Sequence, residues 1–267
     1  MEHSNKNKMT TQISIENTKV YTERMSRSIL DKLFFVDKIY EPVDNIVDFG
    51  CADGALVKTL KDLFSDWRCV GYDSSEVMLH LAREKCPDIE FTSDWGNLNI
   101  DPKRSLLNLS SVIHEVYSYG TKEDVNMFWN RVFKSDFKYV CIRDMMMSDA
   151  DFIPTHPDDV RKVYEACPER LNSFEDEWGS VEDNKNFIHF LLKYRYVENW
   201  ERENKENYLP VTKEELLKLI PDEYEIVYSE HFILPFIKEE VRKDFGIELK
   251  TPTHLKMILK RKDNSDV

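Results

Sequence analysis

The segment from Asp48 to Gly54 places a carboxylate before three small residues, in the pattern Asp48-x-Gly50-x-Ala52-x-Gly54. Small residues let a backbone turn approach a ligand closely, and a helix that begins after the turn directs free N–H groups at that ligand. Asp48 ends an apolar run, where its carboxylate can accept hydrogen bonds from an amine or a hydroxyl. The segment therefore indicates a site for a small polar cofactor, without identifying the cofactor.

Two adjacent titratable residues, His114 and Glu115, follow a second apolar run. Neighbours on a helical turn point about 100° apart, so one side chain can face a reaction centre while the other pairs with protein groups. The ordinary pKa of histidine, about 6.5, suits a general base on oxygen or nitrogen at neutral pH. The alternative is a histidine packed at the edge of the sheet.

A third candidate, Arg143, precedes Asp144 at the end of the apolar run 137–142. Charges immediately after a buried strand cost free energy unless they are paired or in use. Arg143 is therefore a candidate clamp for a carboxylate or phosphate on the substrate. A structural ion pair is the alternative role.

The elements that must position these residues alternate between strand and helix. Strands are expected over 46–49, 68–72, 89–92, 106–113 and 137–142, with helices over 21–39, 55–64, 77–82 and 122–133. This alternation predicts a parallel sheet with right-handed crossovers. A capped helix over 212–219 and strands over 224–232 and 254–259 follow, and the two strands are expected to pair antiparallel at one edge.

Between these parts, residues 145–210 show helical patterns without a strand, over 158–167, 171–178 and 181–203. The run 189–202 interleaves basic and aromatic residues, which can stack bases and contact phosphates. The same pattern fits an amphipathic helix with a buried aromatic stripe and solvated charges. Four nearby glutamates favour this second interpretation. We expect a disordered leader over 1–20, one domain from 21–144 and 211–262, and a helical insertion over 145–210 that acts as a substrate lid.

Composition restricts the function classes. The chain has 267 residues, 41% of them hydrophobic, enough for a sizeable core. It has no apolar run long enough to span a membrane. Five scattered cysteines without a C-x-x-C pair indicate reduced thiols and a cytoplasmic protein, and the histidines show no metal-ligand spacing. A formal charge of −13 argues against a globally basic nucleic-acid surface.

The order of elements, the Asp48–Gly54 turn, an acid at the end of the second strand (Asp73) and the late strand pair resemble the class I S-adenosylmethionine-dependent methyltransferases. The resemblance implies an α/β fold with a Rossmann-like, seven-stranded, mostly parallel sheet, helices on both faces and a helical lid after the fifth strand. A dinucleotide-binding Rossmann domain would carry G-x-G-x-x-G instead, and the spacing here does not fit that motif.

The resemblance also implies a role for each matching position. Asp48, Gly50 and Ala52 would meet the methionine and ribose portion of S-adenosyl-L-methionine, and Gly54 is a further cofactor-binding residue of the same turn. Asp73 would bind the ribose hydroxyls, unless it serves only as a helix cap. The remaining cofactor contacts would come from Ser74 and Met78 beside the adenine, Asp94 and Trp95 at its amine and ring, and Ser110 near the methionine end. Met78 as a core residue and Asp94 as a turn residue are the alternatives.

These observations favour a methyltransferase that transfers a methyl group from S-adenosylmethionine to an oxygen or nitrogen of a small polar metabolite, with no metal and no membrane partner. An RNA-modifying methyltransferase that uses the basic and aromatic run is one alternative. A non-catalytic, cofactor-binding regulatory or partner protein is another. The oligomeric state stays open.

Overall fold

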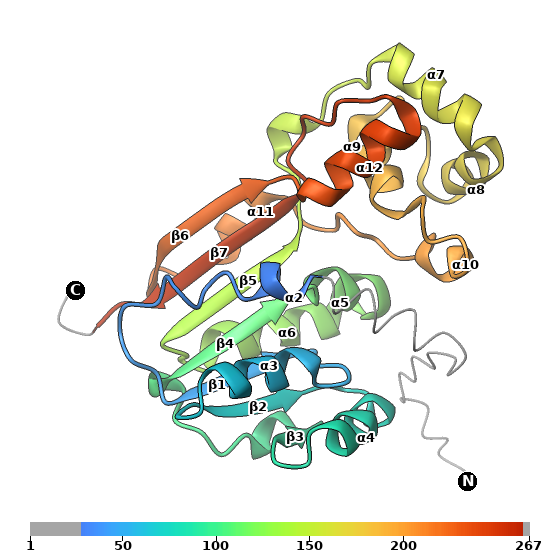
Figure 1. The fold of residues 1–267 in the computed structure, drawn as a ribbon. Helices are drawn as coiled ribbons and strands as arrows, with labels where there is room; N and C mark the ends of the chain where they lie inside the picture. Colours follow the sequence, from blue (N-terminus) through green and yellow to red (C-terminus); the bar gives the residue numbers. More distant parts are fainter. Residues whose placement is uncertain (1–27, 264–267) are drawn as a thin grey trace, which may run out of the picture.

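The computed structural model describes residues 28–263. At its centre lies a seven-stranded sheet with the strand order β3-β2-β1-β4-β5-β7-β6 (Figure 1). The first five strands are parallel, whereas β7 runs antiparallel to both β5 and β6. Their bounds are β1 Asn45–Phe49, β2 Arg68–Tyr72, β3 Glu90–Thr92, β4 Ser105–Ser110, β5 Tyr139–Met145, β6 Tyr224–Phe232 and β7 His254–Arg261. The predicted seven-stranded, mostly parallel sheet is confirmed.

Helices cover both faces of the sheet, so its central strands are buried on both sides. Along β1, Ile46 belongs to one core and Val47 to the opposite core, because successive side chains of a strand alternate between faces. The core on the Ile46 side includes residues of α3 (Ala55–Leu63) and α4 (Glu76–Lys85). The core on the Val47 side includes residues of α5 (Ile113–Tyr119), α6 (Lys122–Lys134) and α11 (Lys213–Leu219). Thr212 caps α11 in a capping box with Glu215, as its spacing suggests.

Helices without strands follow β5. They are α7 (Pro157–Ala166), α8 (Pro168–Trp178), α9 (Asn184–Lys193) and α10 (Trp200–Glu203). A further helix, α12 (Pro235–Phe245), connects β6 to β7 and packs against α7. Its Val241 and Phe245 belong to the hydrophobic core that α7, α8 and α9 share. We call α7–α10 together with α12 the cap; it lies beyond one end of the strands (Figure 1). Short 3-10 helices occupy Trp95–Asn97, Pro102–Arg104 and Asp149–Asp151.

Three elements differ from the expected ranges. Of the helix expected over 21–39, the described part contains only α2 (Ile29–Lys32), because the chain then turns to bury Phe34 and Phe35. β4 ends at Ser110, since Ser111 has a φ of +58° that a strand cannot accommodate. The helix expected over 181–203 is divided into α9 and α10, and the Arg170 guanidinium binds the Tyr194 carbonyl at the division (2.6 Å).

All five cysteines are buried and free. Across residues 28–263, no helix combines the length and the apolar character needed to cross a bilayer. The leader expected over 1–20 lies outside the described residues.

Candidate functional site

The turn after β1 is held in a conformation that favours small residues. Gly50 and Gly54 have φ values of +75° and +77°, and Ala52 between them has +47°. L-residues rarely adopt this left-handed region, whereas glycine enters it without steric cost. A Cβ atom on Gly50 would also lie 2.8 Å from Cγ2 of Val112. The turn therefore needs glycine here for both conformation and space, and α3 begins directly after it.

Asp73 binds this turn from the end of β2. One carboxylate oxygen accepts the Ala52 N–H (2.9 Å) and the other accepts the Ser75 N–H (2.8 Å). Burial raises the pKa of Asp73, while the hydrogen bonds from Ser75 and Ala52 oppose that shift. Each carboxylate oxygen still has a lone pair for a further donor, so the bond to the turn does not exhaust its accepting capacity.

Asp48 lies buried at the end of β1, where Asn108 of β4 donates to its carboxylate (2.7 Å). Burial raises the pKa of Asp48 to about 6, against the opposing effects of Asn108 and the Lys32 ammonium. Ser110, two residues further along β4, donates to the Asn108 side-chain oxygen (3.3 Å). The carboxyl ends of these two adjacent strands thus present a connected set of polar groups.

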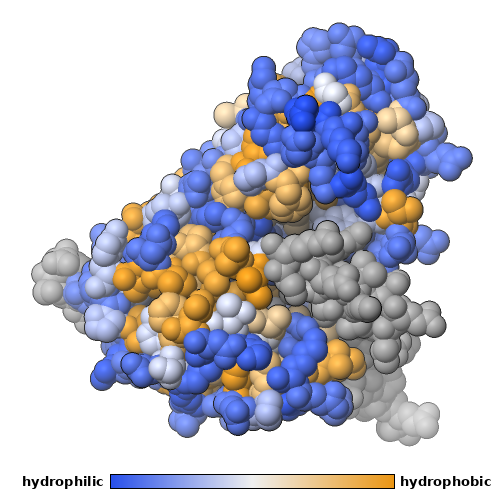
Figure 2. All heavy atoms as spheres, viewed as in Figure 1, coloured by the Kyte–Doolittle hydropathy of each residue, from blue (hydrophilic) through white to orange (hydrophobic). Residues whose placement is uncertain are grey.

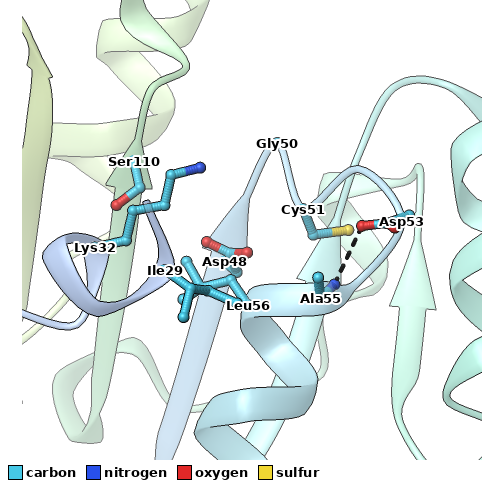
Figure 3. A pocket seen from close by; sticks show the side chains of 9 residues that line it. All are labelled: Ile29, Lys32, Asp48, Gly50, Cys51, Asp53, Ala55, Leu56 and Ser110. Carbon is cyan, nitrogen blue, oxygen red and sulfur yellow. Dashed lines mark hydrogen bonds between the residues drawn. The ribbon is translucent and has the colours of Figure 1, made fainter. Parts of the chain in front are cut away.

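A pocket opens between these strand ends and α2 (Figure 3). In the close-up, the Lys32 side chain extends from α2 above the Asp48 carboxylate, with Ser110 on one side and Gly50 on the other. The residues that line it are Ile29, Lys32, Asp48, Gly50, Cys51, Asp53, Ala55, Leu56 and Ser110. The structure therefore gathers three of the expected cofactor residues, Asp48, Gly50 and Ser110, in one pocket.

The four residues expected around the adenine do not come together in this pocket. Ser74 is exposed, and Met78 is buried in α4. Asp94 caps its own turn by accepting the Gly96 N–H (2.9 Å). The Trp95 ring packs against Phe49 on the α6 side of the sheet, with 5.5 Å between ring centroids. In this arrangement none of the four lines the pocket.

His114 is buried at the start of α5 and bound to Asp144 at the end of β5, with 2.8 Å between Nδ1 and the carboxylate. Asp144 also accepts the Ile113 N–H (2.7 Å), which fixes the first turn of α5 on the sheet. Burial lowers the pKa of His114, but the charge and hydrogen bond of Asp144 outweigh it and raise the pKa to about 9. At neutral pH the imidazole is therefore protonated and donates to Asp144.

Glu115, the next residue, is half-buried. Burial raises its pKa to about 7, and the charges that act on it include His114, Glu206 beyond the end of α10 and Asp73 at the end of β2. It shares a helix face with Tyr119, four residues later, whose hydroxyl donates to Glu206. Glu115 is therefore exposed to the charges of groups from two parts of the chain, the end of β2 and the segment after α10.

Arg143 is buried and engaged with other protein groups. Its Nε donates to the Asp31 carboxylate of α2 (2.8 Å), and Nη1 donates to the Ser111 hydroxyl (2.9 Å). Lys256 of β7 pairs with the other oxygen of Asp31. These contacts match the ion-pair alternative for Arg143, and they attach α2 to the ends of β5 and β7.

Residue patterns did not single out the α2 side chains Ile29, Asp31 and Lys32. A lysine in a short helix is ordinarily exposed, so its sequence position gives no sign that it enters a pocket. The helix expected over 21–39 gives no indication of which of its side chains enters a pocket. Within residues 28–263, no group of three or more His, Cys, Asp or Glu side chains could hold a metal ion.

Residues 46–126 match a protein-family model described as a methyltransferase domain. The putative methyltransferase 235L of Invertebrate iridescent virus 6 is 27% identical over 99 residues, which are 36% of this chain and 37% of the viral protein. The chain thus spans little more than a third of that relative's length.

Two solved structures share the fold. The plantazolicin methyltransferase BamL, solved with a triazolic desmethylPZN analog and SAH, superposes with a TM-score of 0.52 at 15% identity, over 93% of this chain and 90% of BamL. The mitomycin 7-O-methyltransferase MmcR gives 0.51 at 13% identity, over 94% of this chain and 59% of MmcR. The matched domain and the shared sheet topology support the resemblance to the class I S-adenosylmethionine-dependent methyltransferases.

Proposed function

We propose that the protein is an enzyme that transfers a methyl group from S-adenosylmethionine to an oxygen or nitrogen of a small polar metabolite. The observation that carries this proposal is the unit formed by the β1 turn and Asp73, in which the carboxylate accepts the Ala52 N–H at 2.9 Å. This unit stands at the carboxyl ends of parallel strands, where open α/β sheets bind their ligands.

Asp73 and the pocket residue Asp48 fit the polar groups of this cofactor. Asp73 retains accepting capacity for ribose hydroxyls. Asp48 offers a buried carboxylate beside the Gly50 turn, where it can accept from an ammonium group. When bound, S-adenosylmethionine supplies a methyl group already activated by a sulfonium. The protein then has to align the acceptor with that methyl group and exclude water.

Glu115 is the side chain that we propose as proton acceptor. It follows His114 in the first turn of α5, and its pKa of about 7 lets its ionised form take a proton near neutral pH. As the acceptor oxygen or nitrogen took the methyl group and the methyl–sulfur bond broke to leave S-adenosylhomocysteine, the acceptor's proton would pass to this carboxylate. His114, protonated and bound to Asp144, serves to fix the first turn of α5 and thereby positions Glu115. Arg143 contributes indirectly, because its bond to Asp31 holds α2 against the sheet.

Contacts within the cap favour a metabolite over RNA as the acceptor. The aromatic stripe of α9, including Phe187, Phe190 and Tyr194, is buried in the cap core. Of the interleaved basic residues, Lys193 is buried with its ammonium on backbone carbonyls of Glu203 and Glu206. Hydrophilic residues cover most of the cap in the view of Figure 2, whereas apolar residues gather on the half that carries the sheet.

A paired experiment tests the proposal. Calorimetry with S-adenosylhomocysteine measures cofactor binding, and transfer of a radiolabelled methyl group to a cell extract, with and without nuclease, measures activity. We expect binding together with labelled products that survive nuclease. Absence of binding would contradict the proposed cofactor. Binding without labelled product would favour the non-catalytic alternative, and loss of product after nuclease would favour RNA.

A further inference from the structure

A buried carboxylate outside the cofactor pocket, that of Glu206, joins the cap to the helix that carries Glu115. Glu206 lies in the segment after α10 and is only 3% exposed. Tyr119 of α5 donates its hydroxyl to this carboxylate. Arg202 of α10 donates to the same oxygen through Nε (3.1 Å) and Nη2 (2.9 Å). Because Tyr119 follows Glu115 by one helical turn, its bond attaches Glu206 to the face of α5 that carries Glu115.

Two buried side chains of α9 hold the backbone around Glu206 from within the cap. The Lys193 ammonium donates to the carbonyl oxygens of Glu203 (2.8 Å) and Glu206 (2.6 Å), and it lies 4.7 Å from the centroid of the Tyr208 ring. His189 accepts the Tyr208 N–H (3.1 Å). A buried ammonium is costly unless it is bound in this way, so these contacts are specific to the folded segment. α9 therefore fixes the backbone of Glu206, while α5 and α10 hold its carboxylate.

Two further contacts attach the same segment to α5. The Asn207 N–H donates to the Ser118 hydroxyl (2.8 Å), which itself donates to the His114 carbonyl (2.7 Å). The Tyr208 ring packs edge-on against the His114 ring, with 5.5 Å between centroids. The segment and α5 thus form one packed unit, which gives Glu206 a fixed position relative to this helix.

The charges of this unit act on Glu115 in opposite directions. Burial is the main cause that raises the pKa of Glu115, and the charge of His114 opposes it. Glu206 and Asp73 raise this pKa further, whereas Arg202 lowers it. A like charge disfavours the ionised form of a carboxyl and an opposite charge favours it. The two members of the Arg202–Glu206 ion pair therefore have opposite effects on the same carboxyl.

We propose that Glu206 is a positioning residue for methyl transfer, which presents a second negative charge to Glu115 and thereby keeps that carboxyl basic enough to take the acceptor's proton near neutral pH. Arg202, paired with Glu206, limits the size of this effect. The cap then influences the reaction through a charge that it holds against α5. This inference rests on the proposed function, because Glu115 is the proposed proton acceptor.

Titration of the Glu115 carboxyl by NMR tests the inference without an acceptor. The full-length protein is isotopically labelled at its glutamate carboxyl carbons, and Glu115→Gln identifies the Glu115 signal by its absence. Glu206→Gln and Arg202→Gln are compared with the wild type. Glu201→Gln, an exposed change in α10, is the control with the same charge difference as Glu206→Gln. The dispersion of the other glutamate signals reports whether each variant is folded.

We expect the pKa of Glu115, about 7 in the wild type, to fall by about 1 pH unit in Glu206→Gln and to rise in Arg202→Gln, because the two changes remove charges of opposite sign. Glu201→Gln should titrate as the wild type does. A general loosening of the segment would move the pKa in the same direction in both variants. A pKa that is unchanged in Glu206→Gln, or that moves in one direction in both variants, would overturn the inference.

Transfer of a radiolabelled methyl group to a cell extract over the same pH range is the second readout. The rising limb of the rate profile should move to lower pH in Glu206→Gln and to higher pH in Arg202→Gln. A limb that stays in place while the pKa of Glu115 moves would overturn the role of Glu206 in the reaction. A wild type that gives no labelled product would instead contradict the proposed function itself.

Discussion

The carboxylate of Asp73 accepts the backbone N–H of Ala52 at 2.9 Å, which joins the end of β2 to the turn after β1. Twenty-one residues separate the two in sequence, and parallel pairing of β1 with β2 brings them together. The acid therefore stabilises the turn that it borders. A ligand held by Asp73 is also held against that turn.

The first prediction follows from this bond. Asp73→Asn replaces one accepting oxygen by an NH2 group, so the side chain can no longer accept from both Ala52 and Ser75. We expect the affinity for S-adenosylhomocysteine to fall at least about 10-fold, as for a lost charge-assisted hydrogen bond. Calorimetry measures it, with the exposed Asp88→Asn as a control. If Asp73→Asn bound S-adenosylhomocysteine as tightly as the wild type, the proposed binding of the ribose hydroxyls by Asp73 would be contradicted.

A second prediction concerns pH. The pKa of Asp48 is raised to about 6, so lowering the pH through this value protonates the carboxylate and removes its charge. The affinity for S-adenosylhomocysteine should therefore fall between pH 7.5 and pH 5, by about 10-fold per pH unit below the pKa of a single ionised group. Asp48→Asn should bind more weakly and lose this dependence.

Methylthioadenosine supplies the control for that titration, because it carries no ammonium for Asp48 to bind. Its affinity should stay level over the same pH range. A parallel decline for both ligands would assign the titration to another group, for which Asp73, with its raised pKa, is the first candidate.

The third prediction tests Glu115 as proton acceptor. As the pH rises through about 7, Glu115 ionises and the rate of methyl transfer should rise with it. Glu115→Gln should lower kcat by about 100-fold or more and abolish this limb of the profile, while cofactor affinity is retained. Glu201→Gln, an exposed change in the cap with the same charge difference, is the matched control. An unaltered pH profile in Glu115→Gln would exclude the role.

Arg143 gives a fourth prediction that separates its two possible roles. If it acts by attaching α2, Arg143→Met and Asp31→Asn should each weaken cofactor binding, and the double variant should lose little more than either single change. A substrate clamp would behave otherwise: Arg143→Met would raise the KM for the acceptor and leave cofactor affinity intact. Calorimetry and steady-state kinetics on the same three variants distinguish these results.

The fifth prediction concerns the stability of the turn. Gly50→Ala introduces a Cβ atom at φ +75° and 2.8 Å from Val112, and we expect it to reduce the free energy of unfolding by about 2–4 kcal/mol. Gly246→Ala has a similar φ of +65° but no atom within 4 Å, so it should cost only about 1 kcal/mol. Urea denaturation measures both. Equal losses of unfolding free energy in the two variants would mean that backbone strain alone, and not the contact with Val112, destabilises Gly50→Ala.

The sequence alone predicted the architecture and the strand ends at which the candidate site lies. Apolar runs of strand length, separated by helical patterns, require a buried parallel sheet, and small residues after Asp48 specify a turn that only such residues can form. The late strands, with little between them except one helical stretch, were correctly expected to pair antiparallel. These features are local in the chain, so residue types and spacing suffice to predict them.

Tertiary structure decided which side chains meet. His114 and Glu115 are adjacent in sequence, yet packing pairs the first with Asp144 and places the second under the influence of Asp73 and Glu206. Arg143 binds Asp31, 112 residues away, and α2 thereby brings Lys32 into the pocket. α12 joins the cap although it follows β6. Such contacts arise from the geometry of the assembled sheet. The sequence around a charged residue does not indicate which distant residue will become its partner in the folded protein.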